Sequence, residues 1–395
     1  MHDMERSDSE RIEELLARGV EEIIDRASLE RKLRAGAPLR VKLGIDPTSP
    51  HLHLGRSVPL LKLRDFQELG HTAVLIIGDF TGTIGDTSDK DSERPMLSEE
   101  AVAENMKTYI AQAGKIIDIG KAEVVRNSAW LGKLGYSEIG RHADAFALSD
   151  FVARENIRKR LDAGKRVSLR ELLYPLMQGY DSVEVRADVE LGGTDQRFNL
   201  LAGRDLQRAY GAEPQDILMG PIIEGLDGRK MSSSYGNTVN LLDAPNDMFG
   251  KIMSLRDESI IRYFIILTRT PMEVVRTYEM DLARGENPRD IKVRLAHEIV
   301  RMYHGEKEAD AAEGYFKHTF TEKEIPEDMP EFAPNAYDIV SVLVESGLVA
   351  SKSEARRAIE QKGVRIDGAI VEDMHKEVAK GSVLQKGKIK FVKIT

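Results

Sequence analysis

Short apolar runs alternate with longer segments of helical period through the first half of the chain. Residues 41–45 and 73–77 are apolar runs of strand length. Between them, Val58, Leu61, Phe66 and Leu69 recur at the spacing of one helix face. A strand–helix–strand unit of this kind closes with a right-handed crossover and implies a parallel sheet. Further apolar strands are expected at 183–191 and 217–223, so the pattern predicts an α/β fold with a doubly wound, Rossmann-like parallel sheet.

The rest of the chain reads mainly as helices. Helical patterns cover residues 7–34, 97–117, 137–160, 169–180 and 245–301. Residues 321–334 are acidic and rich in proline, which is typical of a linker. Residues 335–395 combine two short helical patterns with strands, and Ser351 is placed to cap the second helix. We therefore expect a catalytic domain at 1–244, a helical domain at 245–320, a linker at 321–334 and a small α+β domain at 335–395.

The turn after the first strand carries polar groups suited to phosphate. The next helix begins near residue 54, so its free N–H groups and positive dipole end face the ends of the strands. Thr48, His53 and Arg56 add side-chain donors to this turn. An ordinary polar connection between a strand and a helix explains the same residues, so the turn alone leaves both readings open.

A long loop after the second strand combines glycines with charged side chains. Asp86 is suited to a substrate ammonium group, and Lys90 and Arg94 to phosphate. Ligands bind beyond the carboxyl ends of parallel strands, and loops of this length are more often functional than not. A surface loop without a ligand is the alternative.

Two polar groups stand out farther along the chain. Tyr174, Gln178 and Asp181 fall on one face of a helix at spacings of four and three. Together they suit a small polar ligand, although a solvated helix face has the same appearance. A Gly-Gly turn follows the strand expected at 183–191, and Asp195 stands where a carboxylate can bind ribose hydroxyls.

Composition and charge narrow the class of protein. The chain has 395 residues, 41% apolar content and no cysteine, which excludes disulfides, cysteine-ligated zinc and cysteine catalysis. No secretory signal or membrane-length apolar run is present, so a cytoplasmic location is the simplest expectation. The net charge of −9 argues against a protein that coats nucleic acid. Residues 335–395, however, hold 11 basic against 8 acidic residues, a weak indication of local RNA contact.

Four motifs, in order along the chain, resemble those of a known family. The run from His53 to Arg56 (His-Leu-Gly-Arg) resembles the HIGH motif of class I aminoacyl-tRNA synthetases, and the run from Lys230 to Ser234 (Lys-Met-Ser-Ser-Ser) resembles their KMSKS loop. Between them, residues 174–181 and 192–199 are similar to the amino-acid and ribose segments of bacterial tyrosyl-tRNA synthetases. Residues 335–395 are similar to the S-four-type RNA-binding domain.

The resemblance implies roles for individual residues. Catalytic roles fall to Thr48, His53, Lys230 and Ser233. The ATP-binding residues would be Gly44, Asp46, Gly55, Arg56, Lys90, Arg94, Gly193, Asp195, Ile222, Ile223, Met231, Ser232 and Ser234. Tyrosine would be bound by Lys42, Thr81, Asp86, Tyr174, Gln178, Asp181 and Gln196. RNA would be bound by Lys352, Arg356, Arg357 and Lys362.

The implied activity is that of a tyrosine–tRNA ligase. Tyrosine and ATP, the latter as its Mg²⁺ complex, would give tyrosyl-adenylate and pyrophosphate, and the acyl group would pass to tRNA(Tyr). The resemblance also implies a homodimer with an interface in the insert at about 120–165, and neither zinc, another resident metal nor a membrane is expected.

Three positions depart from the family pattern. The last histidine of the HIGH motif is replaced by Arg56, the fourth residue of KMSKS is Ser233, and a position that often binds the tyrosine hydroxyl is Lys42. Arg56 is hypothesised to replace the charge lost at Ser233. Two alternatives remain: a tryptophanyl-tRNA synthetase, and a paralogue that has lost catalysis but still binds RNA.

Overall fold

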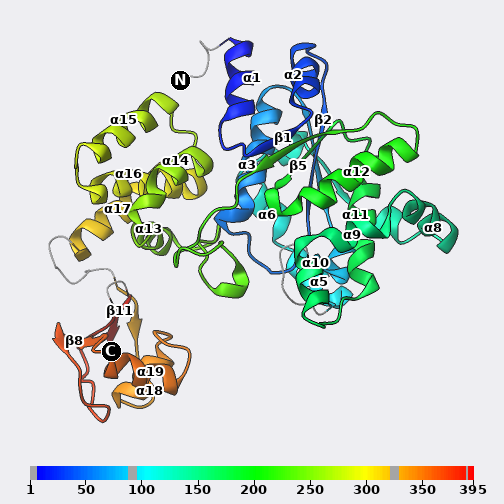
Figure 1. Ribbon diagram of the computed structural model, residues 1–395. Coiled ribbons are helices and arrows are strands. Elements are labelled where there is room, and N and C mark those ends of the chain that lie inside the picture. The colour runs from blue at the N-terminus through cyan, green and yellow to red at the C-terminus, as the bar shows by residue number, and fades with distance from the viewer. Residues whose placement is uncertain (1–6, 88–95, 321–328, 388–389) are drawn as a thin grey trace. The chain divides into compact units, whose positions relative to one another are not determined.

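The computed structural model describes residues 7–87, 96–320, 329–387 and 390–395. The chain divides into two compact units, Met1–Asp243 with Leu255–Leu295, and Ala244–Ser254 with Ala296–Thr395 (Figure 1). The expected linker at 321–334 lies largely outside the described residues, as do Lys90 and Arg94.

The first unit is built on a six-stranded sheet in the order β1-β6-β5-β2-β3-β4. The strands are β1 (Glu22–Ile24), β2 (Arg40–Ile45), β3 (Thr72–Ile77), β4 (Glu123–Arg126), β5 (Val189–Gly193) and β6 (Asp216–Gly220). All neighbouring pairs are parallel except β1 with β6. The expected α/β fold with a parallel sheet is thereby confirmed.

Helices cover both faces of this sheet. The helix α3 (Leu54–Glu68) lies on one face, where Val58 approaches Gly220. Alternate strand residues point to the opposite face, and α11 (Leu169–Glu184) and α12 (Arg197–Ala209) cover it, with Leu200 packed on Ile217. This double layer buries β2 and β3 on both sides, which explains their nearly continuous apolar sequence.

Shorter helices complete the first unit. Before and around the sheet are α1 (Asp8–Ala17), α2 (Arg26–Arg34), α4 (Thr81–Ile84), α5 (Glu99–Met106) and α6 (Tyr109–Ala113). The insert holds α7 (Ser128–Leu131), α8 (Tyr136–Asp144), α9 (Leu148–Ala153) and α10 (Glu155–Asp162), and α14 (Ile260–Leu267) and α15 (Met272–Ala283) follow later in the chain.

Two local predictions are wrong. The segment 183–191 is not one strand: α11 continues to Glu184, and β5 begins only at Val189. Arg186 has φ +51°, so the chain reverses there, and apolar positions on either side belong to different elements. Ile23 and Ile24 likewise lie in β1 rather than in a helix. Hydrogen bonding to β6 holds these two residues in a strand, although their spacing fits a helical pattern.

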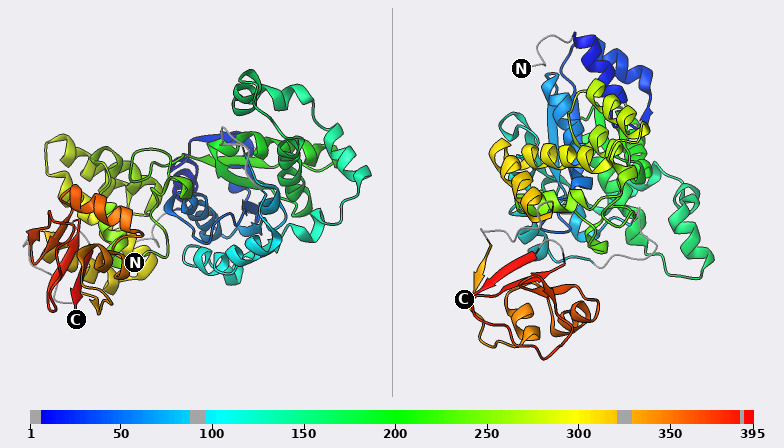
Figure 2. Two further views of the ribbon diagram at one scale, coloured as in Figure 1. Left: turned by 90° about the horizontal axis from the view of Figure 1, so that it is seen from below. Right: turned by 90° about the vertical axis from the view of Figure 1, so that its left-hand side faces the viewer.

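The second unit contains helical and mixed parts. The helices are α13 (Pro245–Met253), α16 (Pro288–His304, whose first turns belong to the first unit) and α17 (Glu306–Phe320); Phe249 stacks on Phe316 at 5.3 Å between centroids. The C-terminal part carries α18 (Ile339–Glu345) and α19 (Lys352–Glu360), drawn in orange in Figure 2. Ser351 caps α19 by accepting a hydrogen bond from the backbone N–H of Glu354, as predicted.

The C-terminal helices pack on a five-stranded sheet. Its order is β7-β11-β10-β8-β9, formed by β7 (Glu331–Phe332), β8 (Val364–Ile366), β9 (Ala369–Ile370), β10 (Val383–Lys386) and β11 (Lys390–Ile394). One continuous apolar cluster joins both helices to the sheet, with Leu343, Ile359 and Leu384 essentially inaccessible. This segment therefore has a core of its own.

Candidate active site

A cavity of about 500 Å³ lies at the carboxyl ends of the parallel strands in the first unit. Nearly all the residues predicted for catalysis and for binding ATP or tyrosine line it: Gly44, Asp46, Thr48, His53, Gly55, Arg56, Thr81, Asp86, Tyr174, Gln178, Asp181, Gly193, Asp195, Gln196, Ile222, Ile223, Lys230, Met231, Ser232, Ser233 and Ser234. Of the predicted site residues that the structure describes in this unit, only Lys42 does not line the cavity.

Lys42 lies behind the cavity in the protein interior. Its side chain is fully buried, and its ammonium group contacts the carbonyl oxygen of Gln178 at 2.8 Å, Ser182 Oγ at 2.7 Å and Glu190 Oε1 at 2.9 Å. An ammonium group has three donors, and these three acceptors engage all of them. The geometry therefore does not support direct contact between Lys42 and a tyrosine hydroxyl.

The first turn of α3 brings the HIGH-like motif to the cavity. His53 precedes the helix and is 7% exposed. A Cβ at position 55 would lie 3.0 Å from the His53 ring, so glycine lets the imidazole lie against the helix start. Burial lowers the pKa of His53 to about 3, with further contributions from Arg56 and Lys230. The imidazole is therefore neutral at physiological pH, and its buried Nδ1 has no hydrogen-bond partner among the described residues.

Arg56 is directed at the loop that follows β2. Its guanidinium donates to the carbonyl oxygen of Asp46 at 2.9 Å, to Thr48 Oγ1 at 2.8 Å and to Tyr109 Oη at 3.3 Å. A rigid fork with several donors can hold this loop in one conformation, whereas an imidazole offers at most two donors. The position that departs from the family motif thus fixes Thr48.

A hydrogen-bonded chain runs from Tyr174 to Asp181 through buried polar groups. Asp46 accepts from Tyr174 Oη and from Thr81 Oγ1, both at 2.7 Å. Asn127 Nδ2 donates to Thr81 Oγ1 at 2.9 Å and to Asp181 Oδ2 at 3.2 Å. The carboxylate of Asp46, expected to serve ATP, is therefore occupied in orienting the tyrosine-binding side of the cavity.

Asp181 is held from both sides. Trp130 Nε1 donates to Asp181 Oδ1 at 2.8 Å, which complements the bond from Asn127. Burial raises the pKa of Asp181 to about 7, against the opposing effect of Lys42 and of these two donors. Asn127 and Trp130 were missed in the sequence, since they follow an edge strand and fall in no motif.

The remaining polar residues of the cavity wall make two further side-chain pairs. Gln196 Nε2 donates to Asp86 Oδ2 at 2.7 Å, and Lys230 Nζ lies 2.8 Å from Asp195 Oδ2. The backbone N–H of Gly55 lies 3.3 Å from Met231 Sδ, so the Lys-Met-Ser-Ser-Ser loop lies against the start of α3. The cavity thus joins an acidic and amide-rich half to a half with helix N–H groups, hydroxyls and a lysine.

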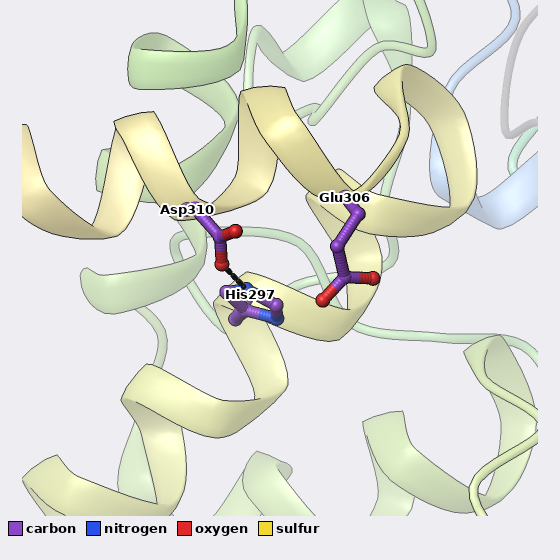
Figure 3. A group of neighbouring side chains, drawn as sticks. All are labelled: His297, Glu306 and Asp310. Carbon is purple, nitrogen blue, oxygen red and sulfur yellow. Dashed lines mark hydrogen bonds and ion pairs between the residues drawn. The ribbon is translucent and has the colours of Figure 1, made fainter.

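Two other groups of charged residues belong to the second unit. Lys352, Arg356, Arg357 and Lys362 are exposed in the C-terminal part of the second unit, and Lys362 is paired with Glu372 at 2.7 Å. His297, Glu306 and Asp310 gather where α16 meets α17 (Figure 3). His297 Nε2 lies 2.9 Å from Asp310 Oδ1, a contact that joins the two helices.

Comparison with known proteins identifies the class. Residues 34–321 match the sequence model of the class I tRNA synthetases of the tryptophan and tyrosine group, and residues 321–393 match the C-terminal domain of the tyrosine–tRNA ligase SYY-like type. The chain therefore belongs to the class I tRNA synthetases. The C-terminal match is to a tyrosine–tRNA ligase domain, and no comparison supports a tryptophanyl enzyme.

Full-length relatives narrow the family further. The tyrosine–tRNA ligase of Mannheimia succiniciproducens is 45% identical over 96% of this chain and 97% of its own length. The tyrosine–tRNA ligase 2 of Vibrio vulnificus is 47% identical with the same coverage, and the tyrosine–tRNA ligase of Moorella thermoacetica is 47% identical over 96% of this chain and 94% of its own. Within its class, the chain belongs to the tyrosine–tRNA ligase family.

Solved structures support the fold. A truncated mitochondrial tyrosyl-tRNA synthetase from Aspergillus nidulans aligns with a TM-score of 0.68 at 21% identity, over 80% of this chain and 95% of that one. The tyrosyl-tRNA synthetase of Archaeoglobus fulgidus, solved in complex with L-tyrosine, aligns with a TM-score of 0.62 at 22% identity, over 78% of this chain and all of that one. No helix among the described residues is long and apolar enough to span a membrane.

Proposed function

We propose that this cavity joins L-tyrosine to ATP, supplied as its Mg²⁺ complex, and then transfers the tyrosyl group to the 3′ end of tRNA(Tyr). The carboxylate of tyrosine attacks the α-phosphorus of ATP, and pyrophosphate leaves. A carboxylate is already nucleophilic, so the protein has to supply position and charge stabilisation rather than a base. The observation that carries this proposal is a single cavity whose wall contains Asp181 and Gln178 together with Lys230 and Asp195.

The ATP half of the cavity has the groups that the developing phosphate charge requires. Neutral His53 and the hydroxyl of Thr48 can each donate a hydrogen bond, and the start of α3 adds a positive dipole end. Asp195 would bind the ribose, and Ile222 and Ile223 the adenine. Lys230, with Ser232, Ser233 and Ser234, would close over the phosphates. Lys90 and Arg94 remain proposed for the same phosphates.

The tyrosine half is suited to a ligand with a phenol and an ammonium group. Asp181 is the buried acceptor for the phenol hydroxyl, while Tyr174, Gln178, Asp86 and Gln196 would contact the amino-acid end. A buried acceptor is left without a donor when phenylalanine occupies the site, and tyrosyl-tRNA synthetases are the standard case of this effect. Selection for tyrosine would therefore depend on Asp181.

ATP–pyrophosphate exchange tests this activity. Exchange measured in parallel with tyrosine, phenylalanine and tryptophan should depend on tyrosine alone. Exchange that depends on tryptophan would instead indicate a tryptophanyl-tRNA synthetase. Silence with all three amino acids, from folded protein that still binds tRNA, would overturn the proposed catalysis and leave RNA binding as the function.

Two partner surfaces are also proposed. Tyr136, Leu148 and Leu169 expose 94%, 66% and 78% of their surface around the insert, and a second copy of this chain would cover them in a homodimer. Lys352, Arg356, Arg357 and Lys362 would contact tRNA phosphates in the cytoplasm. Light scattering of wild type and Leu169→Asp should separate dimer from monomer, and Arg356→Glu should weaken tRNA binding while leaving exchange unchanged.

A further inference from the structure

A fully buried ion pair lies directly behind the tyrosine half of the cavity. Lys42 on β2 and Glu190 on β5 are direct neighbours in the parallel sheet, and their exposed fractions are 0% and 1%. Lys42 Nζ lies 2.9 Å from Glu190 Oε1. A buried ion pair seldom repays its desolvation in stability, so stability alone does not account for this pair.

The pair is bonded to the helix that carries the tyrosine-binding residues. Lys42 donates to the backbone carbonyl of Gln178 at 2.8 Å and to Ser182 Oγ at 2.7 Å. Glu190 Oε1 accepts from Gln178 Nε2 at 3.1 Å, and Glu190 Oε2 accepts from Ser182 Oγ at 3.2 Å. Both charges therefore act on the turn of α11 from Gln178 to Ser182, which contains Asp181.

Glu190 determines which way the Gln178 amide points. An ionised carboxylate only accepts hydrogen bonds, so Gln178 must turn its NH₂ group toward Glu190. Since Gln178 also lines the cavity, its carbonyl oxygen is the amide atom left for a ligand. An ammonium group requires an acceptor, and the reversed amide would present N–H donors to it instead.

We propose that Lys42 and Glu190 are positioning residues for the amino group of tyrosine: Glu190 fixes the Gln178 amide with its oxygen toward the substrate ammonium, and Lys42 holds the Glu190 carboxylate in place through their ion pair. This inference rests on the proposed function, because it needs an amino-acid ligand in the cavity. It also explains a fully buried lysine at a position where the family often has a substrate ligand.

The test removes both charges together. Lys42→Met combined with Glu190→Gln leaves no unpaired buried charge, and glutamine at 190 can donate or accept, so it no longer forces one orientation of Gln178. We expect the KM for tyrosine in pyrophosphate exchange to rise about tenfold or more, with the KM for ATP unchanged. Inhibition by 3-(4-hydroxyphenyl)propanoate, which lacks the ammonium group, should keep its wild-type inhibition constant.

A matched control separates positioning from general destabilisation. Lys62 is also buried, and it donates to the carbonyl oxygens of Leu15 and Arg18 on the far side of α3. Lys62→Met should lower the melting temperature without changing the ratio of tyrosine KM to inhibitor constant.

Two results would overturn the inference. In one, the double variant binds tyrosine as well as the wild type does. In the other, tyrosine and the propanoate weaken equally, which would make the pair purely structural. Failure of the wild type to exchange with tyrosine would instead refute the proposed function.

Discussion

Lys230 Nζ lies 2.8 Å from Asp195 Oδ2, so the lysine of the Lys-Met-Ser-Ser-Ser loop is paired with the carboxylate proposed to bind ribose. The two side chains are 32% and 21% exposed, and an ion pair of this exposure contributes little to stability. In the proposed function, ATP displaces the lysine from Asp195. The ribose would take Asp195, and the released ammonium group would move to the phosphates, where charge develops.

Replacing this lysine should affect chemistry more than binding. In Lys230→Met, Asp195 is free before ATP arrives, so we expect the KM for ATP to stay the same or fall. The rate constant for adenylate formation should fall by about 100-fold, since the charge proposed to stabilise the transition state is lost. Rapid-quench measurement of adenylate formation checks this. Arg229→Met is the control, because it removes a charge from the same loop at a residue outside the cavity wall; a raised KM with an unchanged rate would contradict the prediction.

Restoring the family histidine at position 56 should impair the enzyme. Arg56→His cannot span the carbonyl oxygen of Asp46 and the hydroxyl of Thr48 together, so Thr48 loses its fixed position. We expect kcat/KM for pyrophosphate exchange to fall roughly tenfold. Arg56→Lys keeps the positive charge but loses the forked guanidinium. If the geometry of the fork matters more than the charge, its kcat/KM should fall nearly as far. An unchanged or faster rate in Arg56→His would refute both this account and the hypothesis that Arg56 replaces the charge missing at Ser233.

Tyrosine affinity should increase with pH around neutrality. The pKa of Asp181 is raised to about 7 by burial, with Lys42 opposing and Glu190 reinforcing the shift, so below pH 7 the carboxyl is protonated. The ionised form accepts from the phenol with either oxygen, and the Kd for tyrosine should therefore fall between pH 6 and pH 8. Calorimetric titration checks this. The Kd for phenylalanine, which has no phenol hydroxyl, should not change over the same pH range.

The same group should act on stability with the opposite sign. A carboxyl whose pKa rises on folding stabilises the native state most below its unfolded pKa of about 3.9. That contribution is lost as pH rises through 7. Asp181→Asn should remove the pH dependence of tyrosine binding and this part of the pH dependence of unfolding; persistence of either in the variant would assign it to another group.

Gly78 should tolerate no side chain. A Cβ there would overlap Asp46 Oδ1 and Thr81 Oγ1, the two atoms that join Tyr174 to Asn127. Gly78→Ala should cost about 1–3 kcal/mol of stability and lower tyrosine activation. Gly44→Ala, where an added Cβ has no neighbour within 4 Å, is the control for denaturant unfolding. Equal stability of the two variants would contradict the prediction.

The apolar runs predicted the parallel sheet because strand formation leaves a local pattern. The placement of Thr48, Gln178 and Asp195 in one site came from the resemblance to a known family, and all three line the cavity. The local conformations that the sequence did not predict depend on packing between elements. Ile23 and Ile24 form a strand because they pair with β6. Arg186 has a positive φ angle, a backbone conformation that the residue type does not predict.

The contacts that hold the site residues from behind were also not predicted from the sequence. Lys42 was expected to reach the ligand, but alternation along β2 turns it toward α11, where Glu190 engages it. Asn127 directly follows the edge strand β4, and its partner Asp181 is 54 residues away. Such contacts follow from strand order in the sheet, which a single sequence does not specify.

Trp130 is the only tryptophan in the chain, and its indole N–H is bonded to the carboxylate proposed to receive the tyrosine hydroxyl. The protein therefore contains one indole fluorophore, bonded to the residue that is proposed to select the substrate. Ionisation of Asp181 changes the field at the indole ring, and a phenol bound to the same carboxylate changes it again. The emission of the unlabelled enzyme can thus follow both proton and substrate at a single residue.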